Sequence, residues 1–175
     1  MIVWIAVALV AVIALVLILA ASRPGTFRVE RAATVNAAAE KIFPYVNDFH
    51  NWKSWSPWEG LDPAAKTIFS GAESGLGAVY EWDGNKKAGA GRMEIVESSA
   101  PSRMKLKLDF LRPFEGHNTC EFTLTPAAGA TGVTWAMYGP CPFMMKMMGL
   151  FMSMDAMVGK DFERGLASLK ALAEA

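Results

Sequence analysis

The sequence predicts an α+β domain in which an antiparallel sheet packs against one long C-terminal helix, with a separate apolar helix in front of the domain. Three patterns support this prediction. Residues 154–173 carry apolar side chains at helical spacing along one stripe. The middle of the chain contains several segments in which apolar and polar residues alternate, as in strands with one buried face. Residues 2–21 form an unbroken apolar run, which is long enough to cross a bilayer as a helix.

The apolar run Ile2–Ala21 is expected to remain on the protein as a transmembrane anchor. No Lys or Arg precedes it, and it exceeds the apolar core of a cleaved signal peptide, which is usually about 7 to 15 residues long. A cleaved signal peptide is the alternative, because Ala20 and Ser22 resemble a small-residue cleavage site. Arg23 and Arg28 follow the run, so the positive-inside rule predicts a single-pass protein of the inner (cytoplasmic) membrane whose domain faces the cytoplasm. An exported domain is the alternative.

The chain therefore divides into an anchor at residues 1–22, a linker at residues 23–26 and one folded domain at residues 27–175. Its formal net charge is zero and its pI is near 6.7, which does not favour a nucleic-acid partner. The two cysteines, Cys120 and Cys141, are expected to be free thiols in a reducing compartment, and they would be able to pair if the orientation were reversed.

The alternation of apolar and polar residues gives the order of the elements in the domain. A first strand begins at Phe27 and ends near Val35, Asn36 is expected to cap a helix near residues 37–46, and a short helix follows in the aromatic segment 47–60. Six more strands are expected, at residues 66–71, 78–83, 91–97, 103–110, 118–125 and 133–137. Consecutive strands with one apolar face indicate an antiparallel sheet, whose apolar face the last helix would cover.

Three blocks of the sequence resemble the polyketide cyclase/dehydrase branch of the START-like (SRPBCC) superfamily. The first block runs from Asn51-Trp52 through Trp55-Ser56-Pro57-Trp58 to Asp62-Pro63, the second from Gly75-Leu76-Gly77-Ala78 to Gly84-Asn85, and the third from Met154-Asp155 to Leu169-Lys170. The resemblance implies the helix-grip (START/Bet v 1-like) fold, a curved antiparallel sheet of about seven strands wrapped on the C-terminal helix. It also implies a deep apolar cavity between the sheet and that helix. The fold alone does not select a function, because it hosts carriers, receptors and cyclases.

The side chains expected to line this cavity share the inward parity of consecutive strands or face the sheet from the last helix. Gly159 and Gly165 in that helix indicate a close approach by a strand or a ligand. The same lining residues would also make a solid core, so a domain without a cavity is the alternative. The expected lining residues are Tyr80, Trp82, Met93, Leu106, Leu108, Phe110, Phe122, Trp135, Met157 and Phe162.

The sequence lacks the motifs of common catalytic and metal sites, including HExxH, paired-cysteine zinc spacing, phosphate-binding glycine loops and G-x-S-x-G. His50 and His117 have no evident partner in the sequence. Asp161 and Glu163 fall outside the apolar stripe of the last helix, where we expect them to be solvated or paired. We therefore predict no catalytic residue, no metal and no cofactor, and favour a non-enzymatic role.

Two further segments allow more than one interpretation. The group Trp52, Trp55 and Trp58 would either plug one end of the sheet as core, which we favour, or gate a pocket. Residues 141–153 are rich in methionine and fit a pliable lid over an apolar ligand or a core or membrane-facing hairpin. A copper(I) site beside Cys141 fits less well, because no histidine accompanies the methionines.

We expect from these patterns a membrane-tethered START-like domain that binds or transports a hydrophobic small molecule or lipid. One alternative is an enzyme resembling polyketide cyclases or dehydratases, which would need at least two inward polar groups within hydrogen-bond reach of each other. The other alternative is an interaction module without a pocket.

Overall fold

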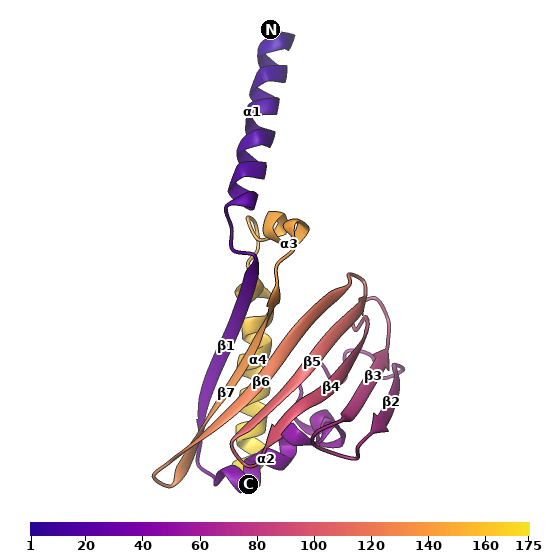
Figure 1. Cartoon of the computed structure of the whole chain (residues 1–175), viewed down its shortest axis with the longest axis vertical. Coiled ribbons are helices and arrows are strands. Elements are labelled where there is room, and N and C mark those ends of the chain that lie inside the picture. The colour runs from indigo at the N-terminus through magenta and orange to yellow at the C-terminus, as the bar shows by residue number, and fades with distance from the viewer.

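The computed structural model describes the backbone of residues 1–175 and every side chain except that of Ile2 (Figure 1). The N-terminal helix α1 (Ile2–Ala21) projects away from the rest of the protein, and the remaining elements form one domain. In chain order these elements are β1 (Thr26–Val35), α2 (Ala39–Asn47), the 3₁₀ helix η1 (Phe49–Ser54), β2 (Lys66–Gly71), β3 (Ala78–Asp83), β4 (Ala90–Ser99), β5 (Arg103–Arg112), β6 (Gly116–Ala127), β7 (Ala130–Pro140), α3 (Phe143–Met148) and α4 (Met154–Glu174).

The seven strands form a single antiparallel sheet in the order β1-β7-β6-β5-β4-β3-β2. The helix α4 lies along β1 and β7 on one face of this curved sheet, and α2 and η1 cover the same face at the end away from α1 (Figure 1). A seven-stranded curved sheet wrapped on a long C-terminal helix confirms the predicted helix-grip arrangement. We call the face that α4 covers the inner face.

The alternation that predicted the strands also sets which face of the sheet is dry. In β5, Met104 and Leu106 are fully buried on the inner face, whereas Lys105 between them points outward and pairs with Glu97 of β4 at 3.0 Å. Such cross-strand charge pairs on a solvated face contribute little each, but they keep the outer face polar.

A register shift between Ile95 and Glu97 interrupts the pairing of β4 with β5. Beyond the shift, Ser98 takes the inward position, and its hydroxyl donates to the side chain of Asn47 in α2 at 2.7 Å. The extra residue bends the strand and lets it meet α2, as bulges commonly do.

Two details of the helices differ from the sequence prediction. The helix α2 begins at Ala39, and Asn36 does not cap it; instead the backbone N–H of Asn36 donates to the carboxylate of Glu174 at 2.6 Å. This bond ties the end of β1 to the C-terminal end of α4. The helix α3 was not predicted, because six residues are too few to show a helical period.

Candidate ligand-binding site

Three stacked rings fill the interior between β6, β7 and α4. The ring of Phe162 lies on that of Trp135, with centroids 4.1 Å apart and planes 5° apart, and Trp135 lies on Phe122 at 4.9 Å. All three side chains are almost completely buried. Trp55 packs edge-on against both Phe122 and Trp135, at 5.8 and 5.4 Å. Aromatic side chains therefore occupy this part of the expected cavity.

The two buried tryptophans of the aromatic segment close the end of the sheet near α2. The indole N–H of Trp52 donates to the carbonyl of Val46 at 3.0 Å, and that of Trp55 donates to the carbonyl of Tyr45 at 2.9 Å. The two indole N–H groups thus donate to carbonyls in the last turn of α2, which have no partner within the helix. Buried indole N–H groups usually find such an acceptor. The plug interpretation thus holds for these two, whereas Trp58 is 37 % exposed and packs edge-on against Trp135 and Phe162.

The indole N–H of Trp135 has no hydrogen-bond partner among the described residues, although the side chain is almost completely buried. Leaving a buried donor unpaired costs about 1–3 kcal/mol, so such a group calls for an explanation. This N–H is a polar group at the centre of an otherwise apolar interior.

A second group of rings lies on the inner face toward the β2 edge of the sheet, and these rings are only partly buried. Tyr80 stacks with Trp82 at 6.1 Å, Trp82 meets Phe110 edge-on at 6.0 Å, and Phe69 extends the row beside Tyr80 at 5.1 Å. Gly91 of β4 makes room for this row, because a methyl group there would overlap the indole of Trp82. We call Phe69, Tyr80, Trp82 and Phe110 the aromatic strip.

Burial raises the pKa of Tyr80 to about 12, and the negative charge of the nearby Glu59 carboxylate raises it further. The phenol therefore stays protonated at neutral pH and acts as a hydrogen-bond donor. Tyr80 and Glu59 therefore place two polar groups beside the aromatic strip.

The structure separates the predicted lining residues into three groups. Leu106, Phe122, Trp135 and Phe162 belong to the filled interior, and Met93 and Leu108 lie almost buried on the strands between that interior and the strip. Tyr80, Trp82 and Phe110 form most of the strip. Met157 is the exception, because its side chain is 47 % exposed. The buried stripe of α4 runs through Gly159, Phe162, Gly165, Leu166 and Leu169.

Both glycines of α4 make room for side chains that come from outside the helix. A methyl group at position 165 would lie 2.8 Å from Cζ3 of Trp135 and 2.9 Å from Cδ of Pro57. A methyl group at position 159 would overlap the guanidinium of Arg31. The predicted close approach is therefore present, and the approaching groups are protein side chains.

Arg31 of β1 holds the first half of α4 through two carboxylates. Its guanidinium donates to both oxygens of Asp155 at 2.7 and 2.9 Å and to Glu163 at 2.7 Å. The hydrogen bonds from Arg31 lower the pKa of Asp155 below its usual value. The expectation that Glu163 and Asp161 would be solvated or paired fits this arrangement, since Asp161 pairs with Arg164 at 2.8 Å.

The two histidines each pair with an aspartate, which the sequence did not reveal. Nδ1 of His117 lies 2.7 Å from a carboxylate oxygen of Asp109 on the outer face, and Nδ1 of His50 lies 2.8 Å from Asp48. Asp109 and His117 face each other because the β5–β6 hairpin places them opposite in register. Knowledge of the hairpin register would have predicted the pair, but the alternation alone does not give that register.

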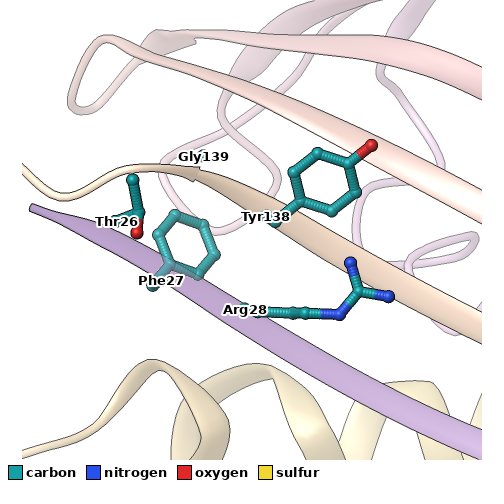
Figure 2. A pocket seen from close by; sticks show the side chains of 5 residues that line it. All are labelled: Thr26, Phe27, Arg28, Tyr138 and Gly139. Carbon is teal, nitrogen blue, oxygen red and sulfur yellow. The ribbon is translucent and has the colours of Figure 1, made fainter. Parts of the chain in front are cut away.

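Two hollows lie at the outer side of the sheet near the start of β1. The larger, about 500 Å³, is lined by Thr26, Phe27, Arg28, Tyr138 and Gly139 (Figure 2). In it the guanidinium of Arg28 lies 5.2 Å from the centroid of the Tyr138 ring. The second, about 380 Å³, adjoins it around Asp109, His117 and Tyr138. Neither is lined by a residue predicted to contact ligand.

Comparison with known proteins agrees with the architecture. A family model described as "Polyketide cyclase / dehydrase and lipid transport" matches residues 26–174. Among curated proteins, none matches the chain significantly in sequence.

Several solved structures share the fold. Major latex-like protein 151 from Panax ginseng is similar over 87 % of this chain and 100 % of its own, with 10 % identity and a TM-score of 0.62. Protein CV1439 from Chromobacterium violaceum is similar over 87 % and 99 %, with 16 % identity and a TM-score of 0.57. The di-domain ARO/CYC BexL from the BE-7585A biosynthetic pathway is similar over 90 % of this chain and 53 % of its own, with 14 % identity and a TM-score of 0.62. At these identities the likeness concerns the fold.

Proposed function

Because this chain belongs to the polyketide cyclase / dehydrase and lipid transport family, we propose that it binds or carries a hydrophobic small molecule or lipid on the inner face of its sheet. The observation that carries the proposal is the aromatic strip. Tyr80, Trp82 and Phe110 are large rings on the dry face of the sheet that the domain leaves only partly covered. Partly exposed aromatic surface in a concave fold is typical of sites for apolar ligands.

The energetics are sufficient for a ligand of modest size. A molecule that buries roughly 300 Å² of apolar surface gains on the order of 7 kcal/mol at about 25 cal/mol per Å². This gain exceeds the lower estimates of the cost of association. Binding at the strip therefore requires few polar contacts.

The unpaired indole N–H of Trp135 supports a ligand that carries one hydrogen-bond acceptor, such as a carbonyl or carboxylate oxygen. An acceptor that reached this N–H would remove the cost of leaving it unpaired. Trp58 packs edge-on against Trp135 and is itself partly exposed, and we include in the proposal that a movement of Trp58 gives the ligand access to the indole.

The proposal includes a membrane tether with the division 1–22 anchor, 23–26 linker and 27–175 domain. The helix α1 has 20 residues, which corresponds to about 30 Å at 1.5 Å per residue, and residues 3–21 are long and apolar enough to cross a membrane. Arg23 and Arg28 favour a cytoplasmic domain on a single-pass inner-membrane protein. Such a tether would place the domain beside the bilayer in which lipophilic ligands are concentrated.

A second candidate function is a reaction resembling that of polyketide cyclases. The observation in its favour is that the Glu59 carboxylate lies near enough to the Tyr80 phenol beside the strip to raise its pKa. An enzyme of this kind requires two polar groups within reach of each other. A Tyr80→Phe variant that retains ligand binding and loses turnover of a polyketide-like substrate would support it.

The binding proposal is tested with residues 23–175, because the family model matches residues 26–174 and so leaves out α1. We expect native mass spectrometry to detect a co-purifying apolar molecule, or the domain to take up a fluorescent fatty acid. Phe110→Ser should weaken uptake, whereas Leu111→Ser, at the neighbouring exposed position, should not. A folded domain that arrives empty and takes up no probe would overturn the proposal.

A further inference from the structure

The segment between β7 and α4, residues 141–153, presents apolar side chains to the outside with little cover from the domain. None of the six residues of α3 is buried, and Phe151 is 86 % exposed. A lid closed over a ligand, or a core hairpin, would turn several of these side chains inward. The exposed large apolar residues of the segment are Phe143, Met144, Met148, Phe151 and Met152.

This segment is fixed beside the end of α1 from which the chain enters the domain. The helix α3 packs against α1 (Figure 1), and Ala20 in the last turn of α1 is fully buried although most of the described side chains before it are exposed. The N–H of Cys141 donates to the carbonyl of Gly25 at 2.8 Å, which joins the start of the segment to the linker. The exposed apolar side chains therefore begin where the predicted membrane span ends.

The charge of this region complements an anionic surface. No Asp or Glu occurs between Glu121 and Asp155, and Lys146 is the one charged residue of the sequence in that interval. Arg23 of the linker lies beside Gly149, since a methyl group there would be 3.6 Å from its Nη1. Apolar side chains together with isolated cations are typical of segments that lie in a membrane interface.

The β5–β6 hairpin lies at the same end of the domain. Because the strands are antiparallel, the start of β6 adjoins the end of β7, and Figure 1 shows this hairpin at the end of the sheet that faces α1. Phe114 at its tip is 74 % exposed. It lies two residues after Arg112, which pairs with Asp83, and directly before Glu115. Trp82 and Phe110 of the aromatic strip also lie near the ends of their strands on this side.

We propose that residues 143–152, with Phe114 as a second point, form a contact with the lipid surface that holds this end of the domain against the bilayer. The inference rests on the proposed tether and goes beyond it. A tether alone leaves the domain free to rotate, whereas a second contact turns the Trp82 and Phe110 end of the strip toward the lipid. An apolar ligand would then pass between bilayer and strip without crossing bulk water.

The test uses the full chain in vesicles of phosphatidylcholine and phosphatidylglycerol. An environment-sensitive fluorophore is attached to a single introduced cysteine, Phe151→Cys, Phe114→Cys, Leu9→Cys in α1, or the control Ala128→Cys in the exposed β6–β7 turn. Cys141→Ser removes the accessible native thiol, and the buried Cys120 is retained. We expect lipids with spin labels near the headgroup to quench positions 151 and 114 several-fold more than position 128.

The outcomes separate the two proposals. If the fluorophore at position 151 is quenched no more than the one at position 128, the surface contact is overturned. This holds whether or not deep spin labels quench the fluorophore at position 9. If deep spin labels do not quench the fluorophore at position 9, the tether is overturned. Quenching of the fluorophore at position 151 by headgroup spin labels in the same sample would still support the contact. Lys146→Glu should reduce quenching at position 151 in anionic vesicles, and Lys53→Glu in η1, at the other end of the domain, should not. Equal effects of these two variants would refute the electrostatic part of the proposal.

Discussion

Replacing Phe162 by Ala tests whether the interior between β7 and α4 is packed as described. The Phe162 ring is fully buried and stacks on Trp135 at 4.1 Å. Removing a buried Phe side chain costs about 3–5 kcal/mol, including the cavity that remains. For a domain of this size each kcal/mol lowers Tm by about 2–4 °C, so Phe162→Ala should lower Tm by roughly 6–20 °C.

The matched control is Met157→Ala, on the same helix. Because the Met157 side chain is about half exposed, its truncation should change the free energy of unfolding by no more than about 0.5 kcal/mol. Near-UV circular dichroism during heating reports the loss of the stacked rings. A shift for Met157→Ala as large as that for Phe162→Ala would refute our assignment of the buried stripe of α4.

Three further predictions concern topology and titration. An alkaline phosphatase fused to the C-terminus should be inactive and a fluorescent protein bright, because Arg23 favours a cytoplasmic domain; the reverse pair of results would place the domain outside. Ellman's reagent at pH 8 should titrate Cys141 and spare Cys120, because burial raises the pKa of the Cys120 thiol to about 12; equal rates would contradict that burial. Asp109 raises the pKa of His117, so the pair stabilises the fold below about pH 6.5 and this contribution is lost as pH rises through the folded pKa. An NMR titration in which Asp109→Asn leaves the pKa of His117 unchanged would contradict the pair.

The sequence predicted the strands well because alternation is a local property. Residues 103–110 alternate strictly, and β5 buries Met104 and Leu106 as expected. The Asn36 cap was wrong because α2 begins at Ala39 with Ala38 in the N-cap position, two residues beyond Asn36. The contact that Asn36 does make is non-local, since its backbone N–H donates to Glu174 near the other end of the chain. Met157 was assigned inward by apolarity, whereas the buried position nearby is Gly159, which lies against Arg31.

The candidate site was less predictable because ring contacts depend on tertiary geometry. Parity placed Trp82, Phe110, Phe122 and Trp135 on one face, and the structure agrees. Parity does not reveal that Phe122 and Trp135 fill the interior with Phe162, while Trp82 and Phe110 stay partly open. That difference follows from where α4 lies, along β1 and β7.

The contact between Arg31 and Gly159 has a consequence for sequence change in relatives. A methyl group at position 159 would overlap the guanidinium that binds Asp155 and Glu163, so a larger residue there requires a shorter side chain at position 31. Residues 31 and 159 should therefore be exchanged together among homologues, and the two carboxylates should disappear with the arginine. A homologue with Arg at 31, a bulky residue at 159 and an undistorted helix would show that the steric coupling can be avoided.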